Sequence, residues 1–181
     1  MTTLLDARTA YFEANGFGED GGYSKATVTV TVLGIPFQIP NTQGRKRAVV
    51  FHDMHHLVTG YATTNLGEAE ISAWELASGC WEYRAAWVLN TGGLLLGVFT
   101  NPTRLFRAFV RGRHSSNLYG RDVDALLRRP VDEVRRELGL ADAPGPASIA
   151  DVGAFALHLA CSLAAAGLPL SFIGWLLVRL F

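Results

Sequence analysis

The sequence is poor in cysteine and has no excess of charge of either sign. Its 181 residues include two cysteines, Cys80 and Cys161, and both lie in apolar stretches. The N-terminus also lacks a basic segment followed by an apolar one, so we expect an intracellular, cytoplasmic protein without a disulfide bond. The 16 basic and 16 acidic side chains balance to a formal net charge of +0. This balance argues against nucleic acid as a partner.

Apolar runs of bilayer length are also scarce. The most apolar part is the tail after residue 148, where Asp151 and His158 interrupt the first segment. The second segment, 170–181, holds about a dozen residues against the 20 or so that a bilayer requires. Because Gly167 and Pro169 separate the two segments, we expect an apolar helical hairpin. It would pack against the core or a partner, or dip into a membrane surface.

The chain divides into three parts around a linker. Residues 141–147 contain Pro144 and Pro146 and are the clearest linker in the sequence. We expect residues 1–140 to form one mainly α, helical bundle-like domain with a small N-terminal β-hairpin. Residues 148–181 would then be the apolar helical hairpin appended to it.

The N-terminal hairpin is predicted from alternating side chains. Residues 27–32 alternate threonine and valine, which indicates a half-buried strand with its valines inward. Phe37 and Ile39 would lie on the returning strand. Because an isolated hairpin is marginally stable in water, we expect these two side chains to close one end of the core.

Three of the five histidines lie within residues 50–60, which read as a helix. At about 100° of rotation per residue, His52 and His56 differ by about 40° around the helix axis, with Asp53 about 60° beyond His56. These three side chains therefore fall on one side. His55 lies on the other side of His52 and is the poorer candidate.

A carboxylate from the next helix is expected to join these side chains. Gly60 ends the first helix, and a second one begins near Asn65, so the two can fold back antiparallel and bring Glu68 alongside. Two imidazoles and two carboxylates suit zinc, our first choice, and also iron(II), manganese or cobalt. The predicted metal ligands are His52, Asp53, His56 and Glu68.

The second helix is expected to run from Glu68 to about Asn90. In it, Glu75 falls on the same face as Glu68, within a stripe of polar and small residues. Glu75 is therefore predicted to orient a histidine ligand or to add a ligand of its own. The alternative is a stripe of acidic residues that faces solvent.

The openness of the site decides its chemistry. Four protein ligands can close a tetrahedral structural site, whereas a catalytic site keeps a position for water or substrate. If Asp53 or Glu68 is only a loose member of the set, the site opens. A hydrogen-bonded cluster without metal is the remaining interpretation.

The full motif, His52-Asp53-x-x-His56, eleven residues, then Glu68, resembles the signature of the coenzyme Q (ubiquinone) biosynthesis protein 4 family. The flanking residues Leu57-Val58-Thr59-Gly60 and Asn65-Leu66-Gly67, and the stretch 130–139, are similar to the family as well. The resemblance covers about residues 45–140. The apolar tail departs from it.

The resemblance implies a mostly helical protein that contacts membranes peripherally and works with other enzymes of ubiquinone synthesis. It implies a polyprenylated ring precursor as ligand and oxidative decarboxylation at the ring carbon that bears the carboxylate. His52, Asp53, His56 and Glu68 would hold the metal and serve as catalytic residues. For this chain we expect a cytoplasmic protein, peripheral on the inner membrane, for which a homodimer is one option.

The same resemblance raises the question of where a prenyl tail would bind. An apolar groove floored by Trp74, Trp81 and Phe106 is the expected site. Beside Phe106, Arg104 and Arg107 form a basic edge next to aromatic side chains, which suits an anionic membrane surface or a phosphorylated ligand. A solvent-exposed row of arginines is the alternative.

Other enzyme classes fit the motif less well. A zincin peptidase has glutamate as general base where this chain has Asp53. Phosphohydrolases with a His-Asp pair and membrane desaturases need more metal-binding histidines than the five present. We favour a metal-dependent decarboxylase over a non-catalytic prenyl-lipid-binding or scaffold protein with a structural metal. A metal-dependent hydrolase is the second alternative.

Overall fold

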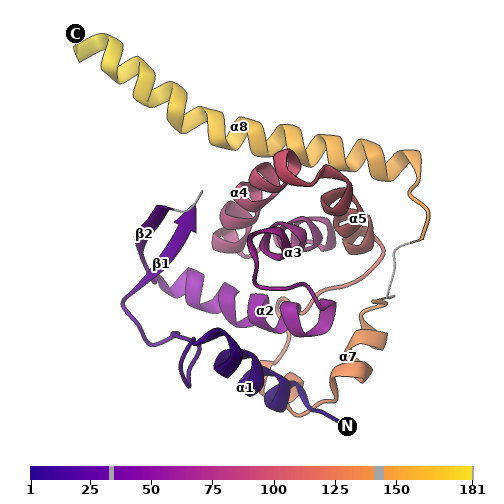
Figure 1. Cartoon of the computed structure of the whole chain (residues 1–181). Coiled ribbons are helices and arrows are strands. Elements are labelled where there is room, and N and C mark those ends of the chain that lie inside the picture. The colour runs from indigo at the N-terminus through magenta and orange to yellow at the C-terminus, as the bar shows by residue number, and fades with distance from the viewer. Residues whose placement is uncertain (33–34, 141–144, 181) are drawn as a thin grey trace.

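The computed structural model describes residues 1–32, 35–140 and 145–180, with side chains considered in 1–29, 35–140 and 145–167. It is mainly α-helical, as predicted, with one two-stranded antiparallel sheet among the described residues (Figure 1). The elements in chain order are α1 (Leu4–Asn15), β1 (Thr27–Val32), β2 (Ile35–Pro40), α2 (Gln43–Thr59), α3 (Asn65–Ser78), α4 (Arg84–Thr100), α5 (Pro102–Arg113), α6 (Val123–Leu127), α7 (Val131–Glu137) and α8 (Ile149–Leu180).

Helix α2 ends at Gly60 and α3 begins near Asn65, as the sequence predicts. The Thr42 side chain caps α2 by accepting from the Arg45 backbone N–H, and Gly60 ends the helix with a φ of 78°. Thr64 caps α3 in the same way. The short connection between the two helices places the first turn of α3 beside the last turns of α2.

The second predicted helix is two helices, so the expected run from Glu68 to Asn90 was wrong. Gly79 follows α3 with a φ of 101°, a conformation that side chains other than glycine rarely adopt, and α4 begins only at Arg84. Asn90 lies inside α4 instead of ending a helix. Gly93 lies there too, and lets α4 approach α3 so closely that a Cβ atom would come within 2.2 Å of the Ser72 hydroxyl oxygen.

The hairpin forms in the predicted place but does not close the core. Strands β1 and β2 pair antiparallel from Thr27 opposite Pro40 to Val32 opposite Ile35. Phe37 is 49% exposed and Ile39 is only half-buried, so neither belongs to the core. The hairpin projects from the side of the molecule (Figure 1).

The core has two parts that meet at α3. One gathers side chains of α2, α3 and the α6–α7 region around Met54 and Trp74. The other gathers side chains of α3, α4 and α5 around Leu94 and Phe109. Helix α3 is buried on several sides, so its carboxylates are held at fixed positions.

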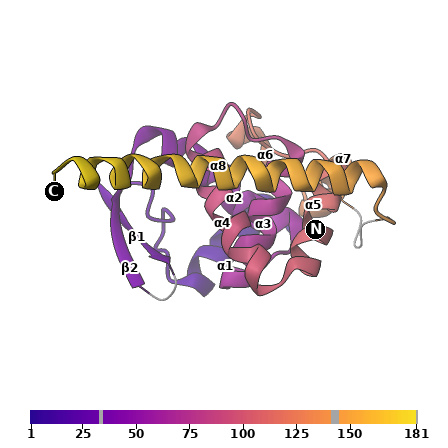
Figure 2. The ribbon, with the colours of Figure 1, turned by 90° about the horizontal axis from the view of Figure 1, so that it is seen from above.

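The apolar tail is one continuous helix, α8, instead of the predicted hairpin. Gly167 and Pro169 lie within it. It packs across α4 and α5, on the opposite side of the molecule from α1 (Figure 1), and Figure 2 shows it from above. Its stretch Ile149–Gly167 is long and apolar enough to cross a membrane by length and composition. Most of the predicted linker, residues 141–144, lies outside the described residues.

Candidate metal centre

Three predicted ligands meet between α2 and α3. His52 and His56 are one turn apart on α2, and their Nε2 atoms are 3.2 Å from each other. Glu68, in the first turn of α3, places Oε2 3.2 Å from His52 Nε2 and Oε1 3.4 Å from His56 Nε2. One ligand atom from each residue lies within 4.8 Å of the others, so the group could hold a metal ion.

The hydrogen bonds on the far side of each ring fix which nitrogen carries a proton. His56 Nδ1 is 2.8 Å from the Tyr61 carbonyl oxygen, which can only accept, so this nitrogen donates. His52 Nδ1 is 3.0 Å from Glu75 Oε1 and donates in the same way. In their neutral forms both rings therefore turn an Nε2 lone pair toward Glu68. Two lone pairs and a carboxylate meet without a donor among them, and a cation is the group that would satisfy all three.

The separations are those of a coordination shell. Two ligands bound 2.0–2.1 Å from a tetrahedral zinc ion are about 3.3 Å apart, close to the 3.2–3.4 Å found here. The Glu68 side chain is 46% exposed and that of His52 is 23% exposed. One side of the group is thus open to solvent, which leaves room for water or substrate.

Glu75 lies inside the protein and contacts the His52 ring. Its side chain is fully buried, yet both oxygens are satisfied. Oε1 accepts from His52 and from His55, whose Nδ1 is 2.7 Å away. Oε2 accepts from the Asn90 amide at 2.6 Å and the Tyr119 hydroxyl at 2.8 Å. Four donors hold the carboxylate in place and fix the orientation of the His52 ring.

His55, Asn90 and Tyr119 are hydrogen-bond partners of Glu75 that the sequence analysis missed. His55 was judged only as a ligand, although its spacing of three from His52 lets both rings reach one carboxylate. Its Nε2 accepts from the Leu118 backbone N–H at 2.9 Å, so Nδ1 must carry the proton that goes to Glu75. Asn90 was expected at the end of a helix. No short-range pattern indicated Tyr119, which comes from a distant loop.

The buried charges shift the pKa values of the cluster in opposite directions. Burial disfavours the charged forms, but the Glu75 and Glu68 carboxylates outweigh it at His52 and raise the pKa of His52 well above its usual range. Burial is likewise outweighed at Glu68, where hydrogen bonds with His52 and His56 lower the pKa to about 2. The pKa of Glu75 also lies well below its usual value. The field of the two carboxylates thus favours a positive charge between the rings.

Asp53 does not join the group that could hold a metal ion. Its Oδ2 accepts from the Tyr23 hydroxyl at 2.6 Å, in the loop before β1. Burial raises the pKa of Asp53, partly offset by this hydrogen bond. Asp53 therefore ties the N-terminal loop to α2 beside the site. The four-ligand set of the sequence analysis becomes three, which is the open arrangement.

The predicted lipid-binding residues are not brought together. Trp74 is fully buried in the core, and its Nε1 donates to Ser115 Oγ. Trp81 is exposed in the connection after α3. Phe106 packs against Phe155 of α8, with ring centroids 5.3 Å apart. Arg104 makes a bidentate ion pair with Glu70, and Arg107 is exposed on α5.

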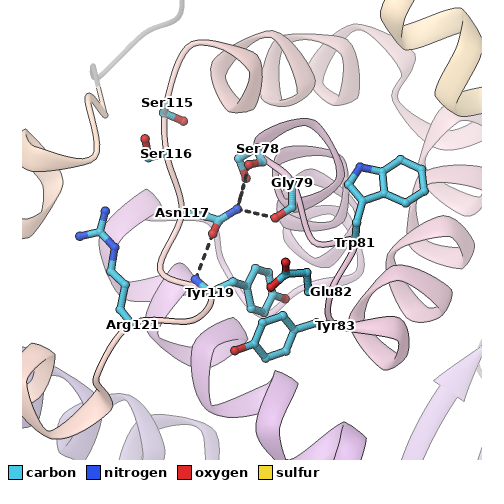
Figure 3. Close-up of a pocket in the computed structure, with 10 residues that line it drawn as sticks. All are labelled: Ser78, Gly79, Trp81, Glu82, Tyr83, Ser115, Ser116, Asn117, Tyr119 and Arg121. Carbon is cyan, nitrogen blue, oxygen red and sulfur yellow. Dashed lines mark hydrogen bonds between the residues drawn. The ribbon is translucent and has the colours of Figure 1, made fainter.

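A pocket of about 550 Å³ has Tyr119 in its wall (Figure 3). Its lining is mixed, with the polar Ser116 and Asn117 on one side and the aromatic Tyr83 and Trp81 on the other. Since the Tyr119 hydroxyl donates to Glu75, this pocket and the metal ligands share one hydrogen-bond network.

Comparisons of the chain with protein-family models, with curated proteins and with solved structures give no match. The likeness to the ubiquinone family therefore rests on the motif, its flanking residues and the stretch 130–139 alone.

Proposed function

We propose that this protein binds a divalent metal ion through His52, His56 and Glu68 and acts on a polyprenylated ring precursor as an oxidative decarboxylase. The observation that carries the metal site is the convergence of two imidazole Nε2 atoms and a carboxylate, which have no donor among them when both rings are neutral, so that a metal ion can replace the proton that otherwise sits between them. The substrate class is supported by the resemblance of the motif to the ubiquinone family.

The residues of the site would divide the work as follows. His52 and His56 hold fixed orientations because their Nδ1 atoms are hydrogen-bonded to Glu75 and to the Tyr61 carbonyl. Glu68 borders the open side, where a ring carboxylate and hydroxyl can approach. The ion, when bound, supplies a Lewis acid that polarises these groups. Replacing the carboxylate by a hydroxyl is a two-electron oxidation, so dioxygen or a comparable oxidant is required as co-substrate.

The identity of the metal bears on this chemistry. Zinc, our first choice from the ligand types, acts only as a Lewis acid, whereas iron(II) takes the same set of two histidines and one carboxylate and reacts with dioxygen. A polyprenyl tail also keeps the substrate in a membrane. We therefore place the protein at the cytoplasmic face of a membrane, near other enzymes of ubiquinone synthesis.

Native mass spectrometry with elemental analysis tests the site, on protein purified without added metal. We expect near-stoichiometric metal in the wild type and in a His114→Ala control, and its loss in a His52→Ala, His56→Ala double variant. Absence of metal from the wild type, even after reconstitution, would refute the proposal.

The metal-loaded protein is then incubated with a polyprenylated ring carboxylate and dioxygen, and released carbon dioxide is measured. Turnover that depends on dioxygen and on His52 supports the decarboxylase. Lipid binding without turnover would indicate a non-catalytic prenyl-lipid-binding or scaffold protein. Hydrolysis without an oxidant would indicate a metal-dependent hydrolase.

A further inference from the structure

The polarity of α8 is inverted relative to a helix on the surface of a soluble protein. Within residues 149–167 the polar side chains are Asp151, His158, Ser162 and the thiol of Cys161. Asp151 and Ser162 are buried, and His158 lies against the Phe109 ring, with centroids 5.1 Å apart. These three side chains face the body of the protein. Water would normally contact the polar face of such a helix.

The outward face of α8 is correspondingly apolar. Every exposed residue in the described part is an aliphatic residue, an alanine, a glycine or Cys161. The largest exposed side chains are Ile149, Val152, Leu163 and Leu157, the last of which is 62% exposed. Figure 2 shows α8 on the outer side of the helices beneath it. This surface needs an apolar partner.

Helix α4, which packs against α8, also exposes apolar side chains. It exposes Val88, Leu89, Leu96 and Phe99, and the Phe99 side chain is 82% exposed. Two neighbouring helices thus expose large apolar side chains, whereas soluble monomers normally scatter them singly.

The length of α8 favours a bilayer over a small apolar ligand. The helix continues to Leu180 and extends past the body in both views (Figures 1 and 2). The 27 residues between Asp151 and Arg179 include no aspartate, glutamate, lysine or arginine. At about 1.5 Å per residue this run is about 40 Å long, against a hydrocarbon core of about 30 Å. The two apolar segments of the tail, of which the second alone is too short to span a bilayer, thus form one continuous helix.

The charges beside this surface select the kind of bilayer. Between Glu82 and Asp122 the sequence contains six arginines and no acidic residue. Arg84 at the start of α4 and Arg107 on α5 are exposed and make no ion pair with a described residue. Each arginine near an anionic membrane surface contributes about 1 kcal/mol of attraction. A symmetric dimer through this face would bring these two arginines of both copies to one interface without adding an acidic partner from this stretch.

We propose that the outward faces of α4 and α8 form a surface that binds an anionic phospholipid bilayer. The apolar side chains of α8 enter the lipid, and Arg84 and Arg107 contact the headgroups. This inference names the surface for the membrane location given under the proposed function, but it does not rest on the decarboxylase activity, since it holds whether the metal site is catalytic or structural.

Vesicle flotation of the full chain tests the surface, with vesicles of phosphatidylcholine alone and of phosphatidylcholine mixed with phosphatidylglycerol. We expect the wild type to float with the vesicles and to bind the anionic mixture more tightly than phosphatidylcholine alone. The affinity of a Leu157→Glu, Leu163→Glu double variant for the vesicles should fall by at least about tenfold. An Arg84→Gln, Arg107→Gln variant should lose the preference for anionic vesicles and much of the salt dependence of binding.

The matched control is Leu5→Glu, the same substitution at an exposed leucine of α1, on the opposite side of the molecule from α8 (Figure 1). It should float like the wild type. Circular dichroism and metal content confirm that each variant is folded. Wild type that stays with neither vesicle, or a double glutamate variant that floats like the wild type, overturns the proposal. So does a lipid-free dimer that the double glutamate variant dissociates, because a second copy then covers this face.

Discussion

Glu75 is the residue on which the polar contacts of the site converge. Its carboxylate is fully buried and accepts four hydrogen bonds, from His52, His55, Asn90 and Tyr119. A buried carboxylate without such donors would have a strongly raised pKa, whereas the pKa of Glu75 is well below its usual value. Its negative charge is therefore available to make the His52 ring a stronger metal ligand.

Replacing Glu75 by glutamine should weaken the metal site without removing a ligand. The glutamine amide places an NH₂ donor where a carboxylate oxygen accepted hydrogen bonds, so it faces groups that also donate. We therefore expect metal affinity to fall about 10–100-fold and the free energy of unfolding to fall by about 1–3 kcal/mol. Titration against a competing chelator measures the affinity. Glu82→Gln, at an exposed position of the connection after α3, is the control. Unchanged affinity in the Glu75 variant would show that this carboxylate does not tune the metal.

The metal-free protein should be most stable near pH 6.5. The pKa of His52 is raised on folding, so its contribution is full below the unfolded value of 6.5 and is lost as pH rises through the folded value. Burial lowers the pKa of His55, so its contribution is full above 6.5 and is lost as pH falls through its folded value. Because the pKa values of Glu68 and Glu75 are lowered on folding, stability is also lost as pH falls below about 4.5, and for Glu68 this loss continues to its folded pKa of about 2.

Melting temperatures measured in chelator across this range test the prediction. Metal competes with the proton on His52 Nε2, so metal affinity should rise with pH, and the alkaline decline in stability should shrink when metal is added. A His52→Asn variant should lose the alkaline decline. A wild-type curve without that decline would contradict the prediction that the folded, metal-free protein holds a proton on His52.

At the scale of elements, the site depends on how closely α3 and α4 approach. Helix α3 supplies Glu68 and Glu75, and α4 supplies Asn90. Gly93 of α4 faces Ser72, which lies one turn from Glu68 on α3. The distance between these helices therefore sets where both carboxylates lie relative to α2.

A methyl group at Gly93 should separate the two helices. Its Cβ would lie 2.2 Å from Ser72 Oγ and 2.7 Å from Ser72 Cβ, so we expect Gly93→Ala to lower the free energy of unfolding by about 1–3 kcal/mol and to weaken metal binding. Gly92→Ala is the matched control, because nothing lies within 4 Å of its Cβ and alanine favours a helix by up to about 1 kcal/mol. Chemical denaturation compares the two. Equal stability in both variants would show that the close approach is not needed.

At the scale of the whole molecule, α8 and the metal site are separate. Helix α8 packs on α4 and α5, whereas the ligands lie on α2 and α3. Asp151 fixes the start of α8: it accepts from Arg113 Nε at 2.7 Å and from the Ser148 backbone and hydroxyl. These bonds hold the pKa of Asp151 well below its usual value.

Asp151→Ala should loosen α8 while leaving the metal site intact. The loss of the helix cap and of the ion pair should cost about 1–2 kcal/mol, seen as faster hydrogen exchange in residues 149–167. Metal stoichiometry should not change. Asp132→Ala, an exposed residue in the first turn of α7, is the control. A loss of metal in the Asp151 variant would show that α8 supports the site.

Local sequence determined the existence of most elements and the heart of the site. Periodicity and turn residues predicted the end of α2, the start of α3 and the hairpin, because backbone propensity and side-chain spacing act over a few residues. The one-turn separation of His52 and His56, with Glu68 after a short turn, likewise needed only helix geometry.

Tertiary structure decided what depends on distant neighbours. Whether Asp53 faces a metal or Tyr23, and whether Glu75 faces solvent or four donors, follows from segments 15 to 44 residues away. The exposure of Phe37 and the burial of Trp74 depend on packing, which apolar character alone does not specify. The course of α8 through Gly167 and Pro169 was not visible in local signals either, since a glycine and a proline favour a break that this helix does not make.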